Sequence, residues 1–189
     1  MTTGRLPGQK DRVTVGTATP LSYTAIHPTE LVDALNTLGV RFLRGGSGAT
    51  RNFAPAVLMA TLASSSEARL RMALIPLLLA HPEFAAEVRQ AEQSLPAKDA
   101  VVLRCSYTAA LWLRAKYGAR LEAVCGPQPP LPDLFGEVLG ISGQTEPDSA
   151  LPLLALRQRE LTGITLNWLG TYEHAAQSWL RFTEHEKQW

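Results

Sequence analysis

The sequence predicts an all-α fold, a single domain of about seven or eight helices packed around a central buried helix, residues 97–117. Apolar residues recur at steps of three and four along most of the chain, which is the period of an α-helix. Several of these stretches have proline near the start and glycine just past the end, as helices do. The stretch between Pro96 and Gly118 is apolar on nearly every side, so helices must cover it on several faces.

The composition fits a protein with one core and gives no general attraction to nucleic acid or membranes. A chain of 189 residues, 46% of them apolar, can bury one sizeable core, and its formal net charge is only +1. Residues 127–189 are acidic overall, whereas residues 1–51 are mildly basic. No signal-peptide core follows Met1, and Cys105 and Cys125 form neither a CxxC pair nor a metal-ligand spacing. We therefore expect a cytoplasmic protein with two free thiols and no membrane span.

The chain divides into a polar N-terminal arm of loose order, residues 1–26, and a helical domain, residues 27–189. Within the arm, residues 12–15 have the composition of one short strand. The domain opens with a helix that has Pro28 in its first turn and ends at Gly39.

A glycine- and arginine-rich loop follows this first helix. Its candidate phosphate or nucleic-acid contacts are Arg41, Arg44, Gly45, Gly46 and Arg51, because glycines let backbone amides approach a phosphate and arginines supply charge. No lysine completes a P-loop, and Arg51 stands where a dinucleotide fingerprint needs its third glycine. The alternative is a flexible connector without a ligand.

The segment from Leu35 to Gly46 resembles the opening of minimal nucleotidyltransferase domains, with Gly39-Val40-Arg41-Phe42 followed by Gly45-Gly46. The resemblance implies a helix and a strand leading to the glycine pair, and then paired carboxylates that hold magnesium. No Asp or Glu lies between Asp33 and Glu67, so no catalytic residue can be transferred and no cofactor is predicted.

The next segment is predicted to be three helices. The first covers residues 53–63, and the second begins at a capping box formed by Ser64 and Glu67. Pro76 lies inside the second helix and predicts a kink. The third covers residues 83–93. The last two helices are similar to one unit of a HEAT-type repeat, but the sequence contains no second copy.

Beyond the central helix, one further turn is expected at residues 121–125. Residues 127–132 are proline-rich and predicted to form an extended internal linker, with an SH3 ligand as the alternative for their PxxP spacing. Asp133 can cap a short helix over residues 134–139. A longer helix is predicted over residues 151–161.

The C-terminal helix, from Thr165 onward, carries an aromatic stripe formed by Trp168, Tyr172, Trp179 and Phe182. Such a stripe is most often part of the core. Large aromatics near a chain end also mark contact surfaces, so Tyr172, Trp179 and Phe182 are the candidate partner interface.

No catalytic or metal-binding constellation is evident. His174 and His185 lie eleven positions apart on one predicted helix, about 16 Å, which is too far to share a metal. Neither an HExxH motif nor a GxSxG motif occurs.

The sequence therefore favours a protein–protein interaction or regulatory protein without its own catalysis, of which an antitoxin-like partner is one form. The expected partner is another protein or a second copy of the chain. The alternative is a helical nucleic-acid-binding regulator that uses the arginines of the glycine-rich loop. An enzyme of unrecognised chemistry is the third hypothesis.

Overall fold

The computed structural model describes residues 1, 26–41 and 43–187, and within them the chain is helical and contains no strand. The predicted all-α class is confirmed. The predicted arm and its short strand lie almost wholly outside the described residues. The elements are α1 (Pro28–Thr37), α2 (Pro55–Ser64), α3 (Ala68–Met72), α4 (Leu74–Ala80), a 3-10 segment η1 (Pro82–Glu87), α5 (Val88–Gln93), α6 (Ala97–Lys116), α7 (Gly118–Cys125), α8 (Gly136–Leu139), α9 (Pro147–Thr162) and α10 (Trp168–Glu186).

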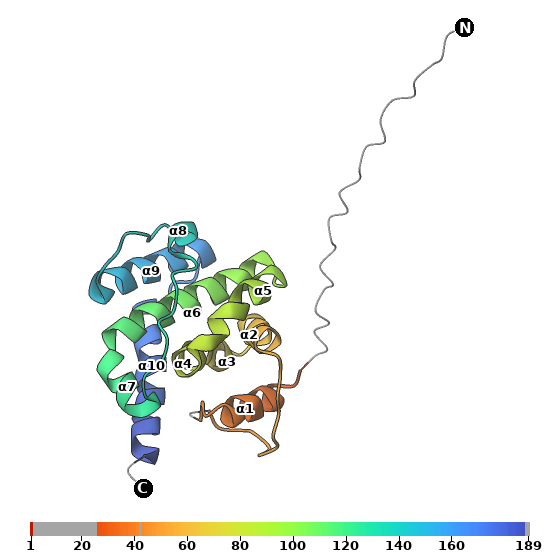
Figure 1. Ribbon diagram of the computed structural model, residues 1–189, viewed down its shortest axis with the longest axis vertical. Coiled ribbons are helices and arrows are strands. Elements are labelled where there is room, and N and C mark those ends of the chain that lie inside the picture. The colour runs from red at the N-terminus through yellow and green to blue at the C-terminus, as the bar shows by residue number, and fades with distance from the viewer. Residues whose placement is uncertain (2–25, 42, 188–189) are drawn as a thin grey trace.

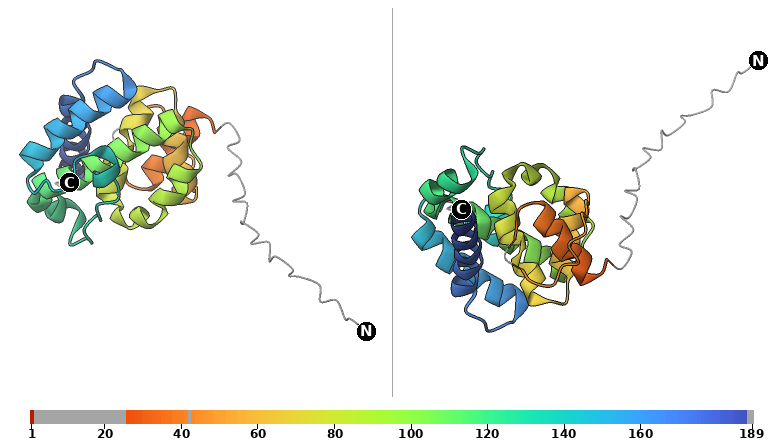
Figure 2. Two further views of the ribbon diagram at one scale, coloured as in Figure 1. Left: turned by 90° about the horizontal axis from the view of Figure 1, so that it is seen from above. Right: turned by 90° about the horizontal axis from the view of Figure 1, so that it is seen from below.

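Helix α6 is the centre of the fold, as predicted. It packs against α2, α4 and α5 from the N-terminal half and against α7, α8, α9 and α10 from the C-terminal half. Figure 1 shows it crossing the middle of the molecule, and Figure 2 shows α1–α5 on one side of it and α7–α10 on the other. Because neighbours surround it, the helix buries residues on all its faces, including Leu103, Cys105, Tyr107 and Ala110.

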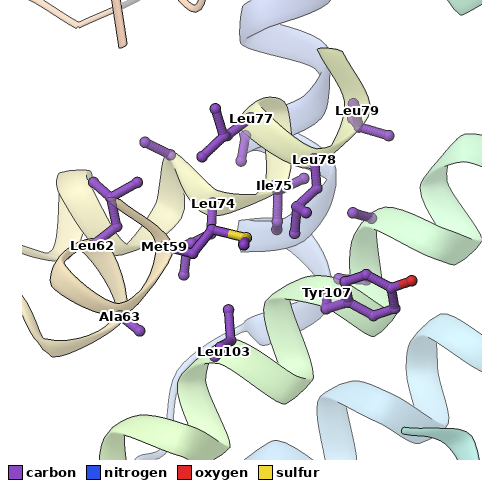
Figure 3. Close-up of a cluster of buried hydrophobic side chains, with 14 of the residues drawn as sticks. Met59, Leu62, Ala63, Leu74, Ile75, Leu77, Leu78, Leu79, Leu103 and Tyr107 are labelled. Atoms are coloured by element: carbon purple, nitrogen blue, oxygen red, sulfur yellow. The ribbon is translucent and has the colours of Figure 1, made fainter. Parts of the chain in front are cut away.

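The most apolar part of the core lies between α2, α4 and α6. Met59 of α2 and the leucine-rich helix α4 face Leu103 and Tyr107 of α6 (Figure 3). Leu74, Ile75, Leu77, Leu78 and Leu79 are all fully buried on α4. Because α4 is buried on every side, all of its faces are apolar, and its sequence is an unbroken apolar run.

The junction between α2 and α4 differs from the prediction in two ways. Ser64 is the last residue of α2, and its hydroxyl donates to the Ala60 carbonyl at 2.9 Å, so it cannot cap the next helix. Glu67 occupies the N-cap position of α3 instead. The helix expected to kink at Pro76 is divided at Ala73, because proline has no N–H to donate to the Met72 carbonyl.

The predicted proline-rich linker is extended and fastened to the body. The Gln128 side chain donates to the Ala80 carbonyl at 2.9 Å, and the Tyr107 hydroxyl donates to the Pro132 carbonyl at 2.8 Å. Leu131 is buried between these two points. Asp133 then accepts hydrogen bonds from the backbone N–H groups of Phe135 and Gly136, at the start of α8.

Ion pairs and hydrogen bonds join α10 to the rest of the domain. Lys116, at the end of α6, contacts both Asp148 of α9 and Glu173 of α10, at 2.8 and 2.9 Å. Arg120 of α7 forms a bidentate pair with Glu184 of α10. No helix in the described part of the chain is long and apolar enough to span a membrane.

Candidate functional site

The glycine-rich loop is folded onto α1 through one carboxylate. Asp33 accepts a hydrogen bond from the Ser47 hydroxyl at 2.7 Å and another from the Gly48 N–H at 2.9 Å. The hydrogen bond from Ser47 holds the pKa of Asp33 below its ordinary value. A Cβ at Gly46 would lie 2.5 Å from Asp33 Oδ1, which explains the glycine there. Two donors of the loop, the Ser47 hydroxyl and the Gly48 N–H, are therefore already occupied by an anion of the protein itself.

Two of the three candidate arginines in this loop are paired with carboxylates. Arg51 lies 3.2 Å from Glu30, and Arg41 lies 3.7 Å from Glu186 near the end of α10. Arg44 is exposed, and its guanidinium has no ion-pair partner among the described residues. Only one of the three candidate arginines therefore presents an uncompensated charge.

The aromatic stripe of α10 is mainly a packing surface. Tyr172 and Trp179 are 1% and 2% exposed, which corrects the expectation that Trp179 is left partly uncovered near the end of the helix. Packing against the helices around α10 covers its indole. Phe182 differs, because 38% of it is exposed. Of the three candidate interface residues, Phe182 is the one a partner can reach.

The loop and α10, far apart in the sequence, meet in one groove. We call it the loop–helix groove. It has a volume of about 460 Å³ and runs between α3 and α10. Its lining residues are Leu43, Arg69, Met72, Thr171, His174, Ala175, Ser178 and Phe182. One hydrogen bond and one ion pair hold the loop beside it. Arg69 donates to the Arg44 carbonyl at 2.8 Å, and Arg41 pairs with the end of α10.

The chemistry of the groove suits apolar side chains within a cationic rim. Leu43, Met72 and Phe182 supply most of its apolar surface. Arg69 and His174 are the lining residues that can carry charge, and no acidic residue lines the groove. No group of three or more potential metal ligands occurs anywhere in the described residues. This lining suits an apolar ligand with negative charge at its edges.

The sequence contained a signal for half of this groove. His174, Ser178 and Phe182 are spaced by four residues and therefore share one face of α10. Arg69 and Met72 are spaced by three on α3 and also share a face. Nothing local indicates that these two faces meet, because the α3–α10 contact depends on how both helices pack on α4.

A second exposed apolar surface lies on α8 and α9, which we call the α8–α9 patch. Its members are Val138, Leu153 and Leu156, each between 42% and 54% exposed. Arg157 and Glu160 form an ion pair at 3.0 Å beside it. The patch is separate from the loop–helix groove and shares no lining residue with it.

The two cysteines are free thiols, as predicted, and neither is arranged as a nucleophile. Burial raises the pKa of Cys105 to about 12, so its thiol is protonated at neutral pH. Burial also raises the pKa of Cys125, the last residue of α7. A protonated, buried thiol is a poor nucleophile, which describes Cys105.

No protein-family model matches this chain, and no curated protein or solved structure matches it either. The function of the groove is therefore inferred from its own residues and their surroundings.

Proposed function

We propose that this protein acts by binding another protein, without catalysis of its own, and that the loop–helix groove is the contact surface. The observation that supports this most strongly is the meeting of Leu43, Met72 and the exposed Phe182 in one apolar groove. An exposed aromatic beside a preformed hollow is typical of an interaction site. A cytoplasmic location belongs to the same proposal and is supported by the two unpaired thiols.

The partner segment is apolar and carries acidic residues. Apolar side chains would fill the floor of the groove, while carboxylates would lie near Arg44 and Arg69 at its edge. Arg69 already contacts Glu67 at 2.6 Å, but almost half of its side chain stays exposed. Arg44 has no such pair in the described part of the chain, so it is the stronger attraction for an acidic group.

A nucleic acid is a poorer fit to the same surface. Phosphate binding would have to separate Arg41 from Glu186 and Arg51 from Glu30. It would also bring an anion next to the Asp33 carboxylate, which holds the loop. Each of these steps opposes binding, and the net charge of +1 adds little attraction at long range.

Selection from a random peptide display library on the immobilised protein tests this proposal. We expect the enriched peptides to combine Leu or Phe with Asp or Glu. A selected peptide should bind the Phe182→Ala and Arg44→Gln variants about tenfold more weakly, since the first loses the exposed aromatic ring and the second the unpaired charge at the edge. The measurement is fluorescence anisotropy of the labelled peptide.

The matched control is Leu156→Ala, which removes an exposed aliphatic side chain of similar accessibility from the α8–α9 patch. Its peptide affinity should equal that of the parent protein. The proposal is wrong if no peptide is enriched, or if the selected peptides bind Phe182→Ala as tightly as the parent. Salt-sensitive retention on a DNA column that Arg44→Gln abolishes would favour the nucleic-acid hypothesis instead.

A further inference from the structure

A small cavity lies inside the domain, enclosed by α3, α6, α9 and α10. Its volume is about 80 Å³, and its apolar lining residues include Met72, Leu166, Trp168 and Tyr172. An outer cavity of about 500 Å³ adjoins it and opens between the α2–α3 turn, α6 and the α9–α10 loop. The two share four lining residues, which are Arg71, Val102, Gln158 and Trp168.

Gln158 gives the inner cavity a hydrogen-bond donor that no described residue uses. The residue is 3% exposed, and its amide oxygen accepts a hydrogen bond from the Tyr172 hydroxyl. The other half of the amide, Nε2, has no hydrogen-bond partner in the described part of the chain. This amide N–H group can therefore donate a hydrogen bond to an acceptor that a ligand supplies.

Two further donors lie on the same walls. Ser106 of α6 is 5% exposed and lines the inner cavity, and its hydroxyl makes no hydrogen bond to any described residue. Arg71 lines both cavities. One of its terminal nitrogens donates to the carbonyls of Ser65 and Ser66, at 2.6 and 3.0 Å. Its other N–H groups have no acceptor among the described residues, and no described carboxylate pairs with it.

The charge of the two cavities is positive overall. The charged lining residues are Arg71, Lys98 and Asp99, and together they carry one net positive charge. Acceptor groups in the ligand, rather than donors, would satisfy Arg71, Ser106 and Gln158 together. The remaining walls are aliphatic and aromatic and would take a flat or branched apolar body.

We propose that this pocket binds a small apolar carboxylic acid. The carboxylate lies where the two cavities adjoin, within reach of Arg71 and Gln158, and the apolar body packs against Met72, Leu166 and Trp168. The chemical class is a small aromatic or branched aliphatic carboxylate. The site shares Met72 and Thr171 with the loop–helix groove, but it does not require Phe182, Arg44 or a protein partner.

Isothermal titration calorimetry of the full chain with benzoate and isovalerate tests the proposal, each compared with its uncharged amide. We expect saturable binding of an acid with a dissociation constant of about 1 mM or lower. The amide should bind about tenfold more weakly, because it loses the charge-assisted hydrogen bonds. The indole N–H signal of Trp168, assigned with a Trp168→Phe variant, should shift in the NMR spectrum as the acid is added.

The variant that isolates the charge is Arg71→Gln, and Arg69→Gln on the same short helix is its control. Arg71→Gln should weaken acid binding about tenfold and leave amide binding unchanged, whereas Arg69→Gln should change neither. Leu166→Trp places a larger side chain at the inner cavity and should abolish binding of both compounds. Because Leu166 is 50% exposed, that variant should fold even if Arg71→Gln does not. Leu156→Trp on the α8–α9 patch is its control.

Three results would overturn the proposal. They are the absence of saturable binding by either acid up to about 10 mM, equal affinity for acid and amide, and binding that survives Leu166→Trp. None of these bears on the loop–helix groove, whose peptide test uses different residues and a different probe.

Discussion

Trp179 and Phe182 lie three positions apart on α10, but their surroundings differ. Trp179 is 2% exposed, and its indole nitrogen has no acceptor among the described residues, so it contributes through packing. Phe182 is 38% exposed at the edge of the loop–helix groove. One of these aromatics therefore stabilises the fold, while the other is available for binding.

This difference predicts opposite outcomes for two alanine variants. Trp179→Ala leaves a large cavity and should lower the free energy of unfolding by about 3–5 kcal/mol. Phe182→Ala should lower it by about 1 kcal/mol or less, since much of the ring is already in water. Urea unfolding followed by circular dichroism measures both. Equal losses in the two variants would mean that Phe182 belongs to the core.

At the scale of single elements, α6 shows which patterns were informative in the sequence. Its apolar residues surround the helix, and its boundaries are marked by Pro96 and Gly118, so both its limits and its burial were predictable. The central position follows from the same observation, because a helix apolar on all sides needs neighbours on all sides.

Substitutions on two faces of α6 test this role. Leu103→Asp places a charge among the side chains of α2 and α4 and should cost well over about 3 kcal/mol, so that little folded soluble protein remains. Ala115→Asp is the control, because Ala115 is exposed on the same helix. Thermal melting of the purified variants gives the answer. If Leu103→Asp melts at the temperature of the parent, α6 is not the centre of the core.

Shorter elements and contacts between elements were less predictable. Ser64 and Glu67 have the spacing of a capping box, but the Ser64 hydroxyl has a competing acceptor in the last turn of α2. The two walls of the loop–helix groove are distant in sequence. In the sequence, Gln158 lies in a polar run, residues 157–160, and Ser106 is one polar residue of α6, so neither stands out as a cavity residue. Local spacing cannot show that such residues meet, because tertiary packing brings them together.

For the whole molecule, carboxylates fasten the peripheral segments to the core. Asp33 holds the glycine-rich loop on α1, and Glu184 holds α10 against Arg120 of α7. The Ser47 hydroxyl lowers the pKa of Asp33, and the Arg120 guanidinium lowers that of Glu184. Both groups are therefore more acidic in the folded protein than in the unfolded chain.

This predicts a loss of stability in acid. A lowered folded-state pKa stabilises the protein above the unfolded pKa, and that stabilisation is lost as pH falls through the folded pKa. Urea unfolding between about pH 7 and about pH 3 should therefore show stability falling below about pH 4.5. Asp33→Asn and Glu184→Gln should each be less stable than the parent at neutral pH and lose less on acidification. The assignment is contradicted if the stability of the double variant, which combines Asp33→Asn with Glu184→Gln, falls with pH in parallel with that of the parent.

The position of α6 between two sets of helices also affects how the protein is made. Synthesis proceeds from the N-terminus, so α2, α4 and α5 can pack on α6 as soon as it leaves the ribosome. The surface of α6 that α9 and α10 cover stays open to water until both have been translated. Each nascent chain therefore passes through a stage with a half-covered apolar helix, which is the kind of surface that molecular chaperones bind.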